Sequence, residues 1–234
     1  MKKGKIFAVL LIIGGLFFVT YTFYPLPEDI NNPPQFCTAD FIELDKINKI
    51  SKFRSFVGHD YSDSFEHDRS MKHYFDPISA YGNSNDNITI YSPVDGTVDY
   101  LNDEQHRLTN GEIRGKQIGI KVKNYEEYTI IIFHLNPFDN ISVGTILHAG
   151  DAIGYADVRE NSNTDIAIMR HIMFLKTKLY SYFQVITEDV FSKYQARGIS
   201  SRNDLIKSRE LVDTLIPNWD EYNEDDWVIL NSPL

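Results

Sequence analysis

Residues 6–24 are apolar and uncharged, and they set the topology expected for everything that follows. The lysines of "MKKGK" precede the run, which extends from Ile6 to Tyr24. Its length of about 19 residues is close to the roughly 20 that a helix needs to cross a bilayer. Because flanking lysines stay on the cytoplasmic side, we expect residues 1–5 to be cytoplasmic and the chain after residue 24 to face outward. No small-residue cleavage site follows the run, which favours an uncleaved, single-pass anchor over a removed signal peptide.

The composition of the whole chain suits one globular domain and argues against nucleic-acid binding. Hydrophobic residues make up 42% of the 234 residues, which is enough for one ordinary core. The net charge of −10 opposes the phosphate backbone of nucleic acids. Cys37 is the only cysteine, so the chain has no internal disulfide and no multi-cysteine zinc site.

Composition and hydrophobic period divide the chain after the anchor into three parts. Residues 25–50 begin rich in Pro and Asn and predict a linker, followed by a short helix within "TADFIELDKINKISKF". Residues 51–175 carry short alternating or β-branched runs separated by glycines, which predict an antiparallel β core. Residues 176–234 carry apolar residues at spacings of three and four, which predict a helical C-terminal extension.

Four segments carry the β prediction. "NITIYSPVDGTVDYL" reads as two β runs around the turn signal Asp95-Gly96. "KQIGIKVKN", "EEYTIIIFHL" and "DIAIMR" are alternating or β-branched runs, the second of which has His134 near its end.

In the last third, Gly198 fits a helix C-cap, and Ser200 or Ser201 fits the next N-cap.

His59 and Asp63 are the first candidates for a chemical role. A zinc site in an enzyme usually takes three protein ligands and leaves one position for water. Two side chains four residues apart can share a cation, either on a helix face or in a loop that wraps around it. A solvated polar loop is the alternative for this pair.

The order of several motifs resembles one family. His59 and Asp63 form an H-x-x-x-D segment, and "YSPVDGTV", "FHL" and "VGTILHAGDAIG" follow in order. Over about residues 55 to 170 this pattern is similar to the lysostaphin-type, LytM-like zinc metalloendopeptidases. The resemblance implies an antiparallel β core of the lysostaphin-type or barrel-sandwich hybrid kind. It also implies zinc held by His59 and Asp63, with His134 facing the metal and stabilising the charge of the transition state.

One family element is changed in this chain. The resemblance places an H-x-H pair on the strand "NTDIAIMR", with the second His as the third zinc ligand. Here Asp165 stands at the first position and Ala167 at the second, and alanine has no lone pair to donate. The expected site is therefore a weakened zinc site, with Asp165 as a candidate general base. Residues that could replace the missing ligand are His67, His73, Asp68 and Asp165.

The stretch "DRSMKHYFDP" is a second kind of signal. It concentrates basic and aromatic side chains, among them Lys72, His73 and Tyr74. It suits either one wall of a groove for a peptide or glycan, or a loop that covers the mouth of the β core.

These observations favour a membrane-anchored, extracytoplasmic metallopeptidase-like domain of the cell envelope with impaired catalysis. We expect it to contact the lipid bilayer through its N-terminal helix and to bind or regulate an envelope peptide, glycan or protein. The alternative is an active zinc metalloendopeptidase that cleaves envelope peptides or peptidoglycan crosslinks with an altered ligand set. A hybrid-barrel carrier is a weaker interpretation, because a carrier needs a modifiable lysine and the tip at Asp95-Gly96 has none.

Overall fold

The computed structural model describes residues 27, 29–173 and 176–233. The anchor predicted over residues 6–24 lies outside these described residues. Within them, no helix has both the length and the apolar character that a membrane span requires.

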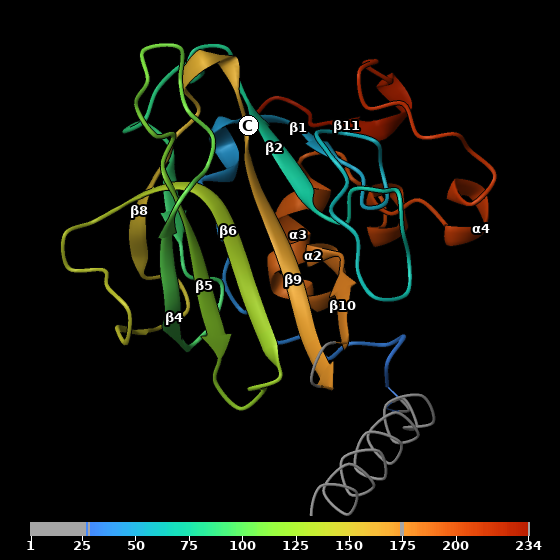
Figure 1. Ribbon diagram of the computed structural model, residues 1–234, viewed down its shortest axis with the longest axis horizontal. Helices are drawn as coiled ribbons and strands as arrows, with labels where there is room; N and C mark the ends of the chain where they lie inside the picture. Colours follow the sequence, from blue (N-terminus) through green and yellow to red (C-terminus); the bar gives the residue numbers. More distant parts are fainter. Residues whose placement is uncertain (1–26, 28, 174–175, 234) are drawn as a thin grey trace, which may run out of the picture.

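The described residues form one sheet of eleven antiparallel strands (Figure 1). The main path runs β11-β1-β2-β9-β6-β5-β4-β7, with β10 beside β9, β8 beside β6 and β3 beside β8. The predicted antiparallel β core is thus confirmed. The strands are β1 (Ile47–Ser51), β2 (His73–Pro77), β3 (Thr89–Tyr91), β4 (Gly96–Asp103), β5 (Lys116–Val122), β6 (Tyr128–Pro137), β7 (Ile146–Leu147), β8 (Ala152–Ala156), β9 (Thr164–Met173), β10 (Lys176–Tyr180) and β11 (Trp227–Ile229).

The described helices are short and gather mainly after β10 (Figure 1). They are α2 (Tyr182–Val185), α3 (Glu188–Ala196) and α4 (Arg209–Val212), together with the 3-10 turns η1 (Leu44–Lys46), η2 (Arg159–Asn161), η3 (Arg202–Leu205) and η4 (Glu224–Asp226). Gly198 follows α3 with φ of 95°, as the predicted C-cap requires. Ser201 caps η3 through a reciprocal bond pattern with Asp204.

Alternation along the central strands gives the sheet two apolar faces. On β6, Ile130 and Ile132 belong to a large hydrophobic cluster, while Ile131 and Phe133 belong to a smaller one. This division follows from the two-residue period of a strand, which sends successive side chains to opposite faces. β9 alternates in the same way. The smaller cluster marks the face on which the candidate site lies.

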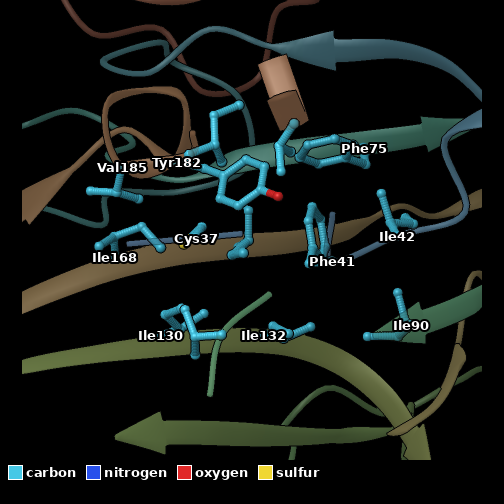
Figure 2. Packing of buried hydrophobic residues seen from close by; sticks show 14 of the residues in the cluster. Cys37, Phe41, Ile42, Phe75, Ile90, Ile130, Ile132, Ile168, Tyr182 and Val185 are labelled. Atoms are coloured by element: carbon cyan, nitrogen blue, oxygen red, sulfur yellow. The ribbon is translucent and has the colours of Figure 1, made fainter. Parts of the chain in front are cut away.

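The large cluster joins the sheet to the segments before β1 and after β10. The ring of Phe41 lies 4.7 Å from that of Phe75 on β2 and 5.3 Å from that of Tyr182 on α2 (Figure 2). Cys37 is fully buried in the same cluster. This apolar packing holds α2 and α3 against the sheet.

Three details differ from the sequence prediction. The short helix expected within residues 38–53 is wrong, because that segment forms only the turn η1 and then enters the sheet as β1. The two runs around Asp95-Gly96 are strands, but β3 pairs with β8 while β4 pairs with β5 and β7. The region 176–234 is only partly helical, because β10 and β11 add two strands to the sheet.

The buried side chain of His73 should make the folded protein less stable in acid. Its two ring nitrogens lie 2.7 Å from the Ser51 carbonyl and 2.7 Å from the Ser181 hydroxyl, and burial lowers its pKa to about 4. Between about pH 6.5 and about pH 4, His73 is protonated in the unfolded chain but neutral in the folded chain. The free energy of unfolding should therefore fall as pH drops through this range. His73→Asn should lower stability near neutral pH but flatten this fall, as measured by urea unfolding across that pH range.

In both the wild type and the His73→Asn variant, Asp40 changes the free energy of unfolding with pH in the opposite direction to His73. Burial raises its pKa to about 6, so it favours the folded chain as pH falls below that value. The difference between wild type and the His73→Asn variant isolates the histidine. Parallel pH profiles for the two proteins would contradict the assignment.

Candidate functional site

Three neighbouring strands meet at the candidate site. In the sheet register Asp165 of β9 lies between Tyr74 of β2 and Phe133 of β6. Residues paired across adjacent strands project on the same face, so these three side chains belong to the face of the smaller cluster. Lys72 precedes β2 and lies two residues before Tyr74, so the two share that face. Its ammonium nitrogen lies 2.6 Å from Asp165 Oδ2.

His134 reaches this face through a break in the alternation of β6. Its φ of 57° is left-handed, and the pairing of β5 with β6 shifts register next to it. A bulge of this kind places an extra residue on one strand and redirects a side chain. The side chains of Phe133 and His134 therefore both project on the face of the smaller cluster, while Leu135 packs in the large cluster. His134 Nε2 lies 3.3 Å from Asp165 Oδ1.

Two glycines allow the chain to pack closely around the site. A Cβ on Gly115 would lie 2.7 Å from the carbonyl carbon of His134, so only glycine fits against the bulge. A Cβ on Gly58 would lie 2.3 Å from the hydroxyl of Tyr74. Both glycines also have left-handed φ values, 62° and 80°. The close contacts and the backbone conformation select glycine at both positions.

A cavity of about 670 Å³ opens at this place. His59 and His134 both line it, so the structure brings these two predicted residues together. Asp165 is fully buried and lies beside His134. The other charged or polar side chains at the cavity that matter for its chemistry are Lys72, Tyr74, Glu104 and Arg114.

The Lys72–Asp165 pair is the electrostatic centre of the site. Only 2% of the lysine side chain and none of the aspartate side chain is exposed. The ammonium also lies 4.2 Å from the ring centroid of Phe133, 4.7 Å from that of Tyr61 and 5.1 Å from that of Tyr74. Burial opposes the charge of Lys72, but the attraction of Asp165 outweighs burial and the pKa of the lysine rises.

Two of the three histidines that line the cavity, His59 and His134, have lowered pKa values and are neutral near neutral pH. Burial, with the positive charges of Arg114 and Lys72, lowers the pKa of His134 to about 4 against the attraction of Asp165. Burial and the charge of Lys72 also lower the pKa of His59. Burial raises the pKa of Glu104, whose carboxylate accepts a hydrogen bond of 3.3 Å from the His134 backbone N–H. Neutral imidazoles can donate and accept hydrogen bonds at once.

Asp63 has a different surrounding from the one that a metal ligand needs. Its Oδ1 accepts hydrogen bonds from the backbone N–H groups of Phe65 (2.7 Å) and Glu66 (2.9 Å). Its Oδ2 accepts one from the N–H of Leu179 at the end of β10 (2.9 Å). The carboxylate therefore ties the loop after β1 to β10, and it does not line the cavity with His59.

Ala167 and the suggested replacement ligands lie elsewhere. Ala167 is 1% exposed and packs in the smaller cluster with Phe53, Met71 and Leu179. His73 projects to the opposite face, where it bonds to Ser51 and Ser181. His67 and Asp68 are exposed, and the helix that would align His59, Asp63 and His67 does not form, because residues 59–67 are a loop.

These donors do not fit a zinc ion. In the described part of the chain, no three His, Cys, Asp or Glu side chains form a group that could hold a metal. Asp63 is occupied by backbone N–H groups, and Asp165 is neutralised by an ammonium at 2.6 Å. A second cation beside Lys72 would meet like-charge repulsion in a buried setting.

Glu104 and Arg114 are the site residues that sequence reasoning missed, and Lys72 was named only as part of a possible groove wall. Lys72 belongs to "DRSMKHYFDP", where a groove wall was one interpretation, and Lys72 and Tyr74 do line the cavity. Glu104 and Arg114 come from the polar segment between β4 and β5, which carries no periodic signal. The segment between β4 and β5 lies near β6 because β4 pairs with β5 and β5 in turn pairs with β6.

Comparison with known proteins gives distant structural similarities. No protein-family model and no curated protein matches the chain. Among solved structures, the chain is similar to lysostaphin in solution (16% identity, TM-score 0.35, covering 51% of this chain and 45% of that one). It is also similar to LytU, with 18% identity and a TM-score of 0.36, covering 56% of this chain and 80% of that one. A third similar structure is Csd3 of Helicobacter pylori, with 16% identity and a TM-score of 0.39, covering 83% of this chain and 45% of that one.

These three neighbours have the LytM or lysostaphin-type peptidase fold. The matched part spans less than half of the lysostaphin chain, at 45%. Because all three TM-scores lie below 0.5, these similarities carry no argument about chemistry, which depends on the residues of the site itself.

Asp63 should act on stability whether or not metal is present. Asp63→Ala removes three hydrogen bonds to backbone N–H groups and should lower the free energy of unfolding by about 2–4 kcal/mol in buffer that contains EDTA. Asp60→Ala, at an exposed position nearby, is the matched control and should change little. Urea unfolding measures both. A stability loss that appears only when zinc is added would contradict the assignment.

The Lys72–Asp165 pair should show strong coupling. Lys72→Met leaves the Asp165 carboxylate buried without its cation and should cost about 3–5 kcal/mol of unfolding free energy. Lys72→Met combined with Asp165→Asn should cost less than the sum of the two single changes, because neither charge is then left alone. Lys121→Met, at an exposed position of β5, is the control. Additive effects in the urea-unfolding cycle would show that the pair is not coupled.

Proposed function

We propose that this chain is a lysostaphin-type, LytM-like peptidase domain that does not hydrolyse and instead binds an envelope peptide, glycan or protein. In this proposal the N-terminal segment over residues 6–24 anchors the domain at the outer side of the cell membrane. The ordered motifs from His59 to "VGTILHAGDAIG" and the antiparallel β core support the family assignment.

The observation that carries the loss of hydrolysis is the buried ammonium of Lys72. Metal-assisted hydrolysis needs a divalent cation that lowers the pKa of a bound water and polarises the scissile carbonyl. At this site the positive charge belongs to a lysine held by Asp165 at 2.6 Å and enclosed by aromatic rings. An ammonium cannot bind and ionise water as a metal does. Asp165 is also a poor general base while it is paired with that ammonium.

The remaining groups suit binding. The cavity of about 670 Å³ falls within the usual size range of small-ligand sites, which is roughly 300–1,000 Å³. It combines neutral imidazoles of His59 and His134 with the amide side chains of Asn102, Gln117 and Asn163. Groups that donate and accept hydrogen bonds match the amides of a peptide or the hydroxyls of a glycan.

One observation favours the second candidate, an active zinc metalloendopeptidase with an altered ligand set. His59 and His134 line the same cavity, although a decayed site need not keep them together. For this function the lysine would have to leave Asp165, and a metal would have to bind between the two histidines. Zinc remains a prediction for this weakened site, and the zinc content of the protein decides between the two functions.

Zinc analysis of the purified full-length chain is therefore the first test. We expect well below one zinc per chain after dialysis against trace zinc, and no cleavage of peptidoglycan crosslink peptides. His59→Ala should leave both results unchanged, because no metal depends on this residue in a binding domain. Stoichiometric zinc together with peptide cleavage that His59→Ala abolishes would establish the metallopeptidase instead.

A further inference from the structure

Arg114 has an unusual position for a charged residue. Only 7% of it is exposed, and its one hydrogen bond from the guanidinium goes from Nη2 to the Asn163 carbonyl at 3.2 Å. Its Nε is buried without any hydrogen-bond partner among the described residues. A buried guanidinium ordinarily requires a carboxylate or another anion, because burial of an unpaired charge is costly.

The other arginines show how guanidinium groups are usually paired in this protein. Each of them except Arg107 has a carboxylate oxygen within 4.0 Å, and the exposed Arg107 is solvated. Arg54 and Arg159 use Nε and Nη2 together to hold one carboxylate in a fork. Within the described residues, Arg114 is thus the buried arginine that no carboxylate pairs.

The carboxylates nearest to Arg114 already have other partners. Asp165 is bound to Lys72 at 2.6 Å, and Asp157 is held by the fork of Arg159 at 2.6 and 2.8 Å. Glu104 accepts the backbone N–H of His134, and burial raises its pKa. All three influence the charge of Arg114 from beyond salt-bridge distance. They do not provide it with a direct anionic partner.

Arg114 lines the same cavity as His59, Lys72 and His134. The ammonium of Lys72 also lies at this cavity, but its charge is balanced by Asp165, and His59 and His134 are neutral. The side chain of Asp103, also at the cavity, is paired with Lys116. Glu104 also lines the cavity, where it accepts the His134 backbone N–H, so Arg114 is the basic side chain of the cavity that has no carboxylate within salt-bridge distance among the described residues.

We propose that the cavity binds its peptide ligand through a carboxylate group that pairs with the guanidinium of Arg114. A planar guanidinium matches a carboxylate in geometry as well as in charge, and such pairs are stronger than neutral hydrogen bonds. The inference rests on the proposed binding function and specifies which chemical group the site recognises. The carboxylate can come from the C-terminus of a peptide or from an acidic side chain, and the test separates these sources.

The test compares three peptides for binding to the full-length chain by isothermal titration calorimetry. The first is N-acetyl-trialanine with a free carboxylate, the second is N-acetyl-trialanine amide, and the third is N-acetyl-Ala-Glu-Ala amide. We expect one carboxylate-bearing peptide to bind about 10- to 100-fold more tightly than the neutral amide, the range expected for a charge-assisted pair. Whichever of the two shows the preference identifies the source of the carboxylate.

Arg114→Gln should abolish this preference, while Arg107→Gln should retain it. The two substitutions remove the same charge from the same segment between β4 and β5, but Arg107 is exposed and bonds only to the Gly111 carbonyl. Arg114→Lys keeps the charge without the planar fork and should give an intermediate preference. If Arg114→Gln fails to fold, the peptide comparison and Arg114→Lys still decide the question.

Three outcomes would overturn the inference without touching the proposed function. Equal affinity for N-acetyl-trialanine and its amide, with the glutamate peptide no tighter, would show that the cavity does not select a carboxylate. A preference that survives Arg114→Gln would place the anion at another group. Binding of none of the three peptides also overturns it. Zinc content and peptide cleavage judge the proposed non-hydrolytic function separately, because neither measurement depends on Arg114.

Discussion

The buried pairing of Lys72 with Asp165 is the interaction on which the rest of the site depends. Neither side chain has meaningful contact with solvent, so each charge is tolerable only because the other is present. The pair keeps Lys72 protonated, so the cavity is lined by an ammonium whose charge Asp165 balances. That charge helps to hold His59 in its neutral form. The chemistry of the cavity is therefore set by an internal ion pair, with neutral imidazoles around it.

The sheet positions this pair through two ordinary rules and one exception. The antiparallel register puts Tyr74, Asp165 and Phe133 in one row across three strands. The two-residue period then separates them from the large core on the opposite face. The exception is the bulge at His134, where a left-handed residue costs roughly 1–3 kcal/mol and is held by the surrounding packing. Strain of this size at a cavity wall fits a residue that is placed for contact with a ligand.

Much of the fold could be predicted from the sequence, because local patterns encode it. Alternation and β-branched runs located β5, β6 and β9, and Gly198 marked the end of α3. The short helix predicted within residues 38–53 was wrong, because apolar spacing in a short segment does not distinguish a helix from a strand. The edge strand β11 was missed, because its three residues gain their structure only from pairing with β1.

The site was predictable only in part, for a related reason. His59, His134 and Asp165 were found from ordered motifs, and they lie at or beside one cavity. The role of Asp63 depends on backbone N–H groups, one of which belongs to β10, more than a hundred residues away in the chain. The importance of Lys72 and Arg114 depends on which carboxylates are already taken. Such competition for partners is a property of three-dimensional packing that no local pattern records.

The pairing of β1 with β11 also has a consequence for the order in which the molecule can be completed. β1 lies near the start of the described chain and β11 near its end, yet Ile50 and Val228 are direct neighbours. During synthesis the outer edge of β1 keeps its backbone groups unpaired until residues 227–229 have left the ribosome. Closure of this edge by Trp227–Ile229 therefore follows the synthesis of every other strand of the sheet.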